Sequence, residues 1–315
     1  MRLAQLTAEY VTFKQSVGMR FRAEAVILNA FCRAMGDIDI TEVSPCLVDN
    51  YLTGTGPLTA FWHRKLEALS GFYRYTISRG HISLSPLPTI IPKRPTNFNP
   101  YIYTNNEYHR LLDMTYILDK SRRSLVQTGT FRTLLLLLYG TGLRISEALS
   151  LTLSDVDLSK GLLTIRNTKF FKTRWVPVGP QLNAALIAYS KMRQKIPSPA
   201  RNESAFFVTL HGTALTRGTA EKIFRRLCEQ ASIRRIDGGR FQPRIHDIRH
   251  TFALNRLISW YREGKDVQHL LPCLSTYLGH VNVAATQRYL TMTPELLHEA
   301  SLRFQQYAFE GGRKS

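Results

Sequence analysis

The chain has 315 residues, 44% of them hydrophobic, and is therefore long enough to bury a substantial core and to form two domains. Its 42 lysines and arginines outnumber 23 aspartates and glutamates, which gives a formal net charge of +19 at pH 7. An excess this large indicates a polyanionic partner, with nucleic acid as the leading candidate. Ribosome-associated or merely basic proteins also reach such values, so the charge alone is not specific.

The cysteines and the apolar runs exclude several other classes of protein. Cys32, Cys46, Cys228 and Cys273 are far apart and form no Cys-x-x-Cys pair, so neither a zinc knuckle nor a disulfide framework is predicted. The N-terminus lacks the long apolar stretch of a signal peptide, and the strongest apolar run, Leu134–Tyr139, is too short to cross a bilayer. We therefore expect a cytoplasmic protein with no membrane partner.

Residues 1–90 are predicted to form a small helical domain. Apolar side chains recur there at helical spacing in short segments that are separated by turn signals. The longest segment runs from about Leu58 to Ser78 and would end at Gly80. Its predicted core face consists of Phe61, Leu66, Leu69, Phe72 and Tyr73. Basic side chains on its flanks would face either a DNA groove or solvent, and they include Arg64, Lys65 and Arg74.

Residues 91–101 are predicted to form an extended linker. Five prolines occur from Ser85 to Pro100, and proline at this density is incompatible with a helix. Lys93 and Arg94 lie within the linker and would either touch DNA phosphates or remain in solvent. The linker separates the helical domain from a second domain, residues 102–315.

The second domain is predicted to be mixed. Its first segment, from Asn105 to Leu118, is helical in pattern, and further helical segments follow. The segments Leu162–Arg166 and Arg174–Val178 are instead rich in β-forming residues, and the stretch between them, with Lys169 and Lys172, is typical of a hairpin. We therefore expect a mainly α fold with a small β-sheet.

Three short segments of the second domain place cations or a tyrosine at predicted helix ends. In the first, Arg144 lies at the start of a predicted helix, where the positive end of the helix dipole stabilises a bound phosphate. Glu147, three residues later, can reach Arg144 and hold its guanidinium. A surface ion pair is the alternative interpretation, because many helices begin with an arginine.

The other two segments contain histidines. His246 and Arg249 are three residues apart on a predicted helix, so both can bind one phosphate, whereas a buried histidine beside a solvated arginine is the alternative. Gly279 fits a helix C-cap, after which His280 is exposed at the turn and Tyr289 falls on the next short helix. Taken singly, Tyr289 is one of 14 tyrosines and carries little information.

In combination and in order, these elements resemble the tyrosine recombinase (phage integrase) family, most closely its Xer-like bacterial members. The resemblance covers the chain from about Asn105 to Tyr289, and the helical N-terminal segment resembles the family's core-binding domain. It implies a core-binding domain followed by a mixed catalytic domain. The elements that carry it are Arg144, a hairpin lysine, His246-x-x-Arg249, Gly279-His280 and Tyr289.

The resemblance implies roles for these residues in DNA strand cleavage. Arg144 and Arg249 would clamp the non-bridging oxygens of a backbone phosphate, because the fork of guanidinium donors matches two oxygens. His246 and His280 would supply further hydrogen bonds to the same phosphate.

The nucleophile and the acid are implied in the same way. Tyr289 would attack phosphorus to give a 3′-phosphotyrosyl link, and Lys169 would protonate the oxygen of the released 5′-hydroxyl. Because the phosphotyrosine conserves the energy of the broken bond, rejoining would need no ATP and no other cofactor. No Gly-x-x-x-x-Gly-Lys-[Ser/Thr] segment is present.

The chain departs from the family pattern at the hairpin and in one spacer. Family members commonly have glycine beside the catalytic lysine, whereas this chain has Thr168 and Phe170 beside Lys169. Counting back from the strand that begins at Arg174 favours Lys169 as the acid, with Lys172 as the second choice. The stretch from Asn255 to Ser275 is also longer than the family's usual spacer.

His250 lies four residues after His246, as paired zinc ligands often do. No third ligand with metal spacing follows, and the glutamate of a His-Glu-x-x-His motif is missing. We therefore expect no metal and interpret His250 as structural support for the site.

The resemblance also implies a partner and an assembly. The family's recombinases act as tetramers, so we expect a homotetramer on double-stranded DNA that carries paired recombination sites. After Tyr289, Pro294 begins a last helix whose apolar face would dock either on a neighbouring protomer or on its own domain. Integration, excision, transposition of a mobile element and dimer resolution all remain open as the biological task.

Three other functions fit part of the sequence. A type IB topoisomerase would use nearly the same residues, but the small helical N-terminal domain and the Xer-like spacing favour a recombinase. A DNA-binding accessory factor without catalysis would explain the charge but not a tyrosine near two arginines. A metal-dependent hydrolase that uses His246, His250 and His280 is the most distant option.

Overall fold

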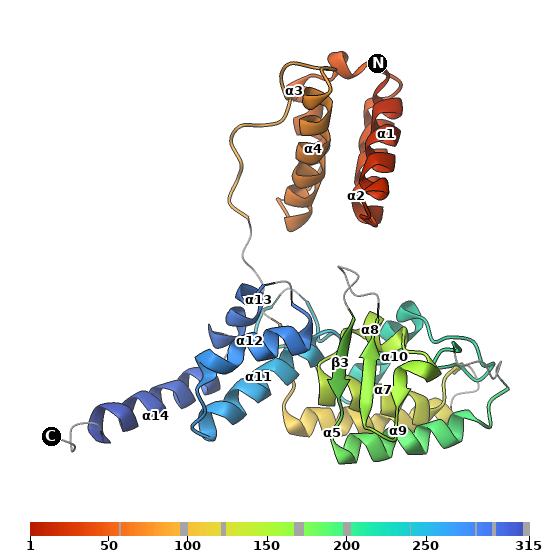
Figure 1. The fold of residues 1–315 in the computed structure, drawn as a ribbon, viewed down its shortest axis with the longest axis vertical. Helices are drawn as coiled ribbons and strands as arrows, with labels where there is room; N and C mark the ends of the chain where they lie inside the picture. Colours follow the sequence, from red (N-terminus) through yellow and green to blue (C-terminus); the bar gives the residue numbers. More distant parts are fainter. Residues whose placement is uncertain are drawn as a thin grey trace. The chain divides into compact units, whose positions relative to one another are not determined.

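The chain divides into two compact units, Met1–Asn97 and Phe98–Ser315. The computed structural model describes residues 1–56, 58–94, 100–120, 124–166, 173–197, 203–239, 241–280, 282–291 and 294–310. Both units are helical, and the second also contains a small antiparallel sheet (Figure 1), which confirms the expected mainly α fold with a small β-sheet. None of the helices in the described residues has the length and apolar character of a membrane span.

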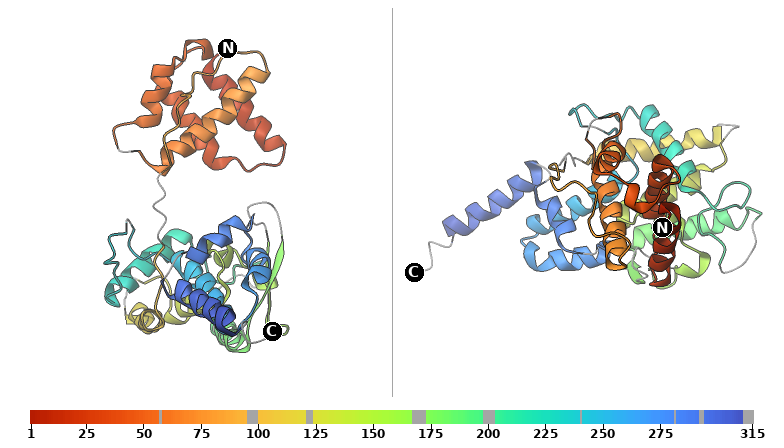
Figure 2. Two further views of the ribbon diagram at one scale, coloured as in Figure 1. Left: turned by 90° about the vertical axis from the view of Figure 1, so that its left-hand side faces the viewer. Right: turned by 90° about the horizontal axis from the view of Figure 1, so that it is seen from above.

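The described part of the N-terminal unit consists of helices that pack against one another in a small bundle. They are α1 (Leu3–Ser16), α2 (Arg22–Met35), the 3-10 helix η1 (Ile40–Glu42), α3 (Pro45–Thr53) and α4 (Ala60–Ser78). α2 and α4 each contact all three of the other α-helices (Figure 2). Large buried side chains fill the space between them, including Leu6, Leu28, Phe31, Leu69, Phe72 and Tyr73.

The turns between these helices follow local capping rules. The Ser44 hydroxyl accepts a hydrogen bond from the amide of Leu47 at the start of α3, and the Thr59 hydroxyl accepts one from the amide of Phe61 at the start of α4. One prediction for α4 is wrong, because the side chain of Phe61 is 50% exposed. Phe61 lies in the first turn of the helix, outside the cluster of buried side chains.

The second unit begins with helices that surround α7, whose apolar side chains are buried on more than one face. α8, α9 and α11 contact α7, and α12 and α14 contact α11. The helices are α5 (Asn105–Asp113), η2 (Met114–Tyr116), α6 (Ile117–Lys120), α7 (Thr128–Thr141), α8 (Ile145–Leu149), η3 (Leu153–Asp155), α9 (Pro180–Arg193), α10 (Arg217–Gln230), α11 (Asp247–Arg262), α12 (Val267–Leu278), α13 (Ala284–Gln287), η4 (Arg288–Thr291) and α14 (Pro294–Glu310).

The sheet of this unit is antiparallel and small. Its strands are β1 (Val156–Asp157), β2 (Leu162–Ile165) and β3 (Arg174–Pro177), in the order β1-β2-β3. Leu163 pairs with Val156 on one side and with Val176 on the other. Leu163 and Val176 are buried, so this face of the sheet packs on the helical core.

Gly142 lies in the turn between α7 and α8, next to the residues of the candidate site. It ends α7 with a φ of 61°, in the left-handed region that glycine adopts at little cost. A β-carbon added to Gly142 would lie 2.4 Å from Cδ1 of Phe252 on α11 and 3.0 Å from Cδ2 of Leu278 on α12. The absence of a side chain therefore lets the turn between α7 and α8 approach both helices closely.

Replacing Gly142 with alanine should destabilise the second unit by about 2–4 kcal/mol, because the new methyl group adds overpacking to the cost of the left-handed backbone. Urea unfolding measures the loss. Gly264→Ala is the matched control, since Gly264 has a φ of 68° and an added β-carbon meets nothing within 4 Å. The control should cost only about 1–2 kcal/mol, and equal losses in the two variants would contradict the packing explanation.

Candidate active site

Arg144 lies at the N-cap position of α8, with extended backbone angles of −67° and 142°. Its amide donates to Glu147 Oε2 at 3.0 Å, and its Nη1 donates to Glu147 Oε1 at 2.9 Å. Its Nη2 reaches across to the carbonyl oxygen of Gly279 at 3.1 Å. One third of the side chain remains exposed, so Arg144 is held firmly yet accessible to a ligand.

Glu147 connects Arg144 with a second arginine that the sequence analysis treated only as a strand residue. Arg174 on β3 donates from Nη1 and Nη2 to the two carboxylate oxygens at 3.2 and 2.8 Å, and from Nε to the carbonyl oxygen of Tyr277 at 2.9 Å. Burial alone would raise the pKa of Glu147, but the hydrogen bonds and charges of the two arginines hold that pKa below its usual value. The buried carboxylate is therefore ionised and paired twice.

A signal for Arg174 was present in the sequence. In a strand, alternate side chains share one face, so Arg174 lies on the same face as Val176, which is buried. An arginine that points inward from a short strand needs a buried anionic partner. Strand alternation combined with the nearby Glu147 would have found it.

Arg249 is the most deeply buried cation of the site, with 2% of its surface exposed. Its Nη1 donates to the carbonyl oxygen of Gly142 at 2.8 Å, and its Nη2 donates to that of Leu278 at 2.7 Å. Burial, followed by the charge of Arg144, lowers the pKa of Arg249 to about 10. The guanidinium therefore stays protonated at neutral pH and binds the turn after α7 to the C-terminal end of α12.

The histidines of the site are neutral at pH 7. Desolvation, followed by the charge of Arg249, lowers the pKa of His246 to about 4, although part of its side chain is exposed at the start of α11. The pKa of His280 is likewise lowered to about 4 by burial and by Arg249. His280 lies after the C-cap Gly279, and its Nδ1 is 2.7 Å from Oγ1 of Thr286.

Tyr289 lies in η4 with 2% of its surface exposed. Its hydroxyl oxygen is 2.9 Å from Nδ1 of His250, a buried side chain on α11. Burial raises the pKa of Tyr289, while the charges of Arg249 and Arg144 and a side-chain hydrogen bond from Arg249 oppose that rise. The structure thus brings Tyr289 into one site with Arg144, Arg249 and the histidines.

Two predicted site residues cannot be placed. Lys169 and Lys172 lie outside the described residues. Among the residues that are described, no group of three or more His, Cys, Asp or Glu side chains is arranged to hold a metal ion.

The basic residues predicted to contact DNA from the N-terminal unit differ in their surroundings. Arg64, Arg74 and Lys93 are exposed, and Nη1 of the exposed Arg94 lies 3.6 Å from Oε1 of Glu67. Lys65 is instead half-buried, and its Nζ donates to the carbonyl oxygen of Tyr51 at 2.6 Å, at the C-terminal end of α3. Lys65 therefore caps the C-terminal end of α3, where the negative end of the helix dipole stabilises a cation.

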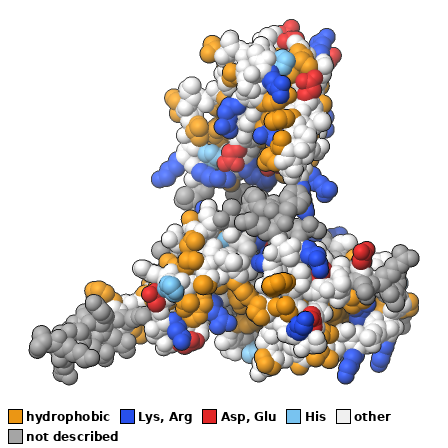
Figure 3. All heavy atoms as spheres, viewed as in Figure 1, with side chains coloured by type: hydrophobic (Ala, Val, Ile, Leu, Met, Phe, Trp, Pro, Cys, Tyr) orange, Lys and Arg blue, Asp and Glu red, His pale blue; other side chains and the backbone are white. Residues whose placement is uncertain are grey.

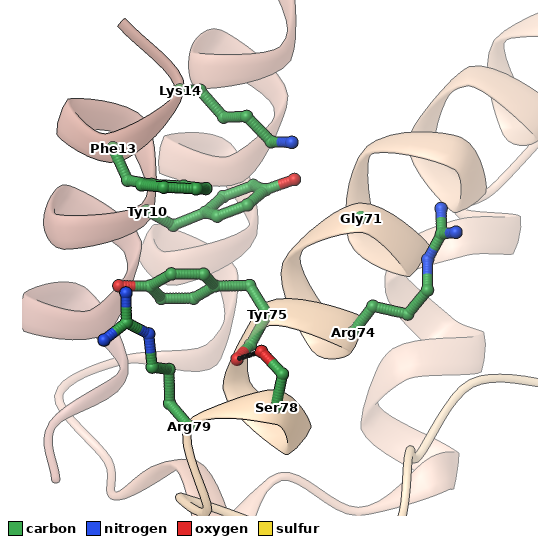
Figure 4. Close-up of a pocket in the computed structure, with 8 residues that line it drawn as sticks. All are labelled: Tyr10, Phe13, Lys14, Gly71, Arg74, Tyr75, Ser78 and Arg79. Atoms are coloured by element: carbon green, nitrogen blue, oxygen red, sulfur yellow. Dashed lines mark hydrogen bonds between the residues drawn. The ribbon is translucent and has the colours of Figure 1, made fainter. Parts of the chain in front are cut away.

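A shallow hollow of about 400 Å³ opens between α1 and α4 of this unit (Figure 4). Phe13 and Tyr75 stack with ring centroids 5.4 Å apart, and Nζ of Lys14 lies 5.4 Å from the ring centroid of Tyr10. Cations beside aromatic rings are typical of surfaces that bind nucleic acid. The residues that line the hollow are Tyr10, Phe13, Lys14, Gly71, Arg74, Tyr75, Ser78 and Arg79.

Known proteins of one family resemble this chain over most of its length. The description of the phage integrase family matches residues 103–295. The integrase/recombinase y4rB of Sinorhizobium fredii is 33% identical over 96% of both chains, and the tyrosine recombinase XerC of Chlorobaculum tepidum is 31% identical over 84% of this chain and 77% of its own length. The integrase of transposon Tn1549, solved with transposon right end DNA, has the same fold with a TM-score of 0.72, at 17% identity over 98% of this chain and 100% of its own.

Glu147→Gln should lower the free energy of unfolding at pH 7 by about 2–4 kcal/mol, because two partly buried arginines lose their counter-charge. The lowered pKa of Glu147 means that its stabilising contribution is complete above its usual value of 4.5 and is lost as pH falls through the folded-state pKa. Urea unfolding between pH 7 and pH 3 should therefore show a weaker acid sensitivity in the variant.

Glu221→Gln is the matched control for this experiment. Glu221 forms an exposed pair with Arg217 on α10, with Nε and Oε1 2.7 Å apart. Such a pair contributes about 0–1 kcal/mol. A Glu147→Gln variant as stable as this control would refute the central role of the carboxylate.

Proposed function

Because the chain belongs to the phage integrase family, it is a tyrosine recombinase that breaks and rejoins DNA in site-specific recombination, and we propose that Tyr289 is its nucleophile. The observation that carries this proposal is the position of the Tyr289 hydroxyl, which lies 2.9 Å from Nδ1 of His250 in a site where the charges of Arg249 and Arg144 act on the same phenol. In this role Tyr289 attacks a backbone phosphorus and forms a 3′-phosphotyrosyl link.

Arg144 and Arg249 are the proposed phosphate ligands. Each guanidinium has five N–H donors, and the hydrogen bonds described above use only some of them. The remaining donors can reach non-bridging oxygens and stabilise the charge that develops as the phenolic oxygen attacks. Both side chains are held by backbone carbonyl oxygens and, for Arg144, by Glu147, so little reorganisation accompanies binding.

His246 and His280 are proposed to add neutral hydrogen bonds to the phosphate. Lys169, with Lys172 as the second choice, is proposed to protonate the leaving 5′-oxygen. The phosphotyrosyl ester retains the energy of the original bond, so that a 5′-hydroxyl can displace Tyr289 and restore the strand without a cofactor. The exchange is thus chemically reversible.

Double-stranded DNA with paired recombination sites is the proposed substrate. Lysine and arginine side chains are spread over the visible face of each unit (Figure 3), in keeping with the net charge of +19. The exposed Arg64, Arg74, Lys93 and Arg94, together with the hollow between α1 and α4, are proposed DNA contacts of the N-terminal unit. The half-buried Lys65 is not proposed as a direct DNA contact, because its Nζ donates to the carbonyl oxygen of Tyr51 and supports the packing of α3.

Tyr289→Phe should abolish covalent attachment of the protein to DNA, because phenylalanine has no oxygen to attack phosphorus, while DNA binding stays nearly intact. Cells that produce the wild-type chain should yield protein–DNA adducts that survive denaturing detergent, and sequencing of the attached ends identifies the cleavage site and its polarity. Formaldehyde cross-linking measures binding by the variant. Adducts that persist in Tyr289→Phe would remove Tyr289 from the role of nucleophile.

We also propose that the recombinase acts as a homotetramer on DNA through α14. Its start is tied to α11, since Leu296 is buried and Nε of Arg262 lies 2.7 Å from Oε1 of Glu299. Leu297 and Phe304, seven residues apart and therefore on one face of α14, are 52% and 71% exposed, and α14 projects away from the rest of the second unit (Figures 1 and 2). An apolar face without cover fits docking on a neighbouring protomer.

The double variant Leu297→Ser and Phe304→Ser should retain its melting temperature and DNA affinity as a monomer but form fewer tetramers on paired sites, because the apolar contact is lost. Mass photometry on DNA measures the assembly. Gln305→Ser, an exposed polar position on the same helix, is the control and should assemble normally. Undiminished tetramers in the double variant would exclude this docking role for α14.

A further inference from the structure

The Tyr289 hydroxyl has two side-chain contacts that differ in what they can exchange with it. The guanidinium of Arg249 hydrogen-bonds the hydroxyl and can only donate. The other contact is Nδ1 of His250, at 2.9 Å from the phenolic oxygen. A neutral imidazole accepts at Nδ1 in one of its two tautomers, and in that tautomer the O–H of Tyr289 donates to His250.

The surroundings of His250 keep its ring neutral in the absence of DNA. Burial is the first cause that lowers the pKa of His250 to about 3, and nearby positive or protonatable groups add to it. These groups come from the same helix, from the segment before it and from the end of α12. They are His246, Arg249, Arg244 and His280.

We propose that His250 is a further catalytic residue, which receives the proton of Tyr289 while the phenolic oxygen attacks phosphorus. The inference rests on the proposed function of Tyr289 as nucleophile. In the cleavage step, the O–H bond of Tyr289 breaks and its proton passes to Nδ1 of His250, as the oxygen's electron pair forms the new bond to phosphorus. The bond from phosphorus to the 5′-oxygen breaks at the same time, and that oxygen takes a proton from Lys169.

Rejoining reverses each transfer. The incoming 5′-hydroxyl attacks phosphorus and gives its proton to Lys169, and the departing oxygen of Tyr289 recovers its proton from His250. No oxidant, metal or external base is consumed in the cycle. His250 and Lys169 thus act on opposite sides of phosphorus, one on the tyrosine oxygen and the other on the DNA oxygen.

The site disfavours this proton transfer in the absence of DNA, and a bound phosphate favours it. Without DNA, the raised pKa of Tyr289 and the lowered pKa of His250 keep the proton on the phenol. A phosphodiester anion beside Arg249 offsets part of the positive charge that disfavours an imidazolium. The phenol therefore loses its proton only as it bonds to phosphorus, which restricts the reactive nucleophile to the DNA complex.

His246 is a less suitable acceptor in this geometry. Its ring meets the ring of His250 edge-on, with centroids 5.0 Å apart, whereas the hydrogen bond to Tyr289 is made by His250. The two histidines lie four residues apart on the same side of the start of α11. His250 thus stands between His246 and the nucleophile.

The test is single-turnover cleavage of a nicked duplex that carries the site sequence recovered from the wild-type adducts. His250→Asn places an amide oxygen near the position of Nδ1, so it keeps a hydrogen-bond acceptor but cannot take a proton. Covalent cleavage should fall by about 10²–10⁴-fold, with unchanged duplex affinity in a gel-shift titration. Added imidazole should restore part of the rate in His250→Ala. The control His269→Asn, an exposed histidine on α12, should cleave like the wild type.

A second duplex with sulfur in place of the 5′-bridging oxygen separates the base from the acid. Thiolate leaves without protonation, so this substrate should restore cleavage in Lys169→Ala but not in His250→Asn. If His250→Asn cleaves as fast as the wild type, or if its loss comes from DNA binding, His250 is not the base. That result would leave Tyr289 as nucleophile, whereas persistent adducts in Tyr289→Phe would refute the proposed function itself. Melting temperatures show whether each variant is folded. If His250→Ala does not fold, the cleavage rate of His250→Asn decides the test without the imidazole experiment.

Discussion

The site depends on one buried ion pair network, in which the carboxylate of Glu147 is shared by Arg144 and Arg174. The three residues belong to α8, its N-cap and β3, and both arginines also donate to carbonyl oxygens at the end of α12. The carboxylate and its two arginines therefore hold α8, β3 and the C-terminal end of α12 in fixed positions relative to each other. Because a buried charge is costly when unpaired, none of these elements can shift without losing a partner.

Backbone carbonyl oxygens at the end of α12 are the second constraint. Helix termini leave carbonyl groups without partners, and here the oxygens of Tyr277, Leu278 and Gly279 accept from the arginines of the site. Gly279 ends the helix in a left-handed conformation, and a β-carbon there would lie 2.7 Å from Nη1 of Arg174. The glycine that the sequence analysis interpreted as a cap thus also makes room for a guanidinium.

Sequence reasoning could predict those features that short-range patterns determine. The caps, the helix of Arg144 and the helical start at His246 follow local rules, and the order of residue types led to the family. Arg174 was missed because its partner, Glu147, lies 27 residues away along the chain and becomes adjacent only when β3 packs beside α8. Phe61 was misjudged because its neighbour Trp62, four residues before Leu66, takes the buried position in the first turn of α4.

His250 illustrates the same limit. A histidine four residues after another marks one helix face, and only the return of η4 to α11 places a hydroxyl beside it. Spacing within one helix therefore supported a structural interpretation, whereas the contact depends on two segments 39 residues apart. Neither of these two segments indicates the contact by its own pattern, whereas strand alternation does indicate a buried partner for Arg174.

The shared carboxylate also determines the formal charge of the site. Among the described residues, three guanidinium groups and one carboxylate, with neutral histidines, leave two net positive charges around the place proposed for phosphorus, and the proposed acid Lys169 would add a third. A phosphodiester carries one negative charge, but the five-coordinate phosphorus formed by attack of a deprotonated phenol carries two. A positive surplus attracts the doubly negative state more strongly than the intact DNA, which is the condition for binding energy to accelerate a reaction.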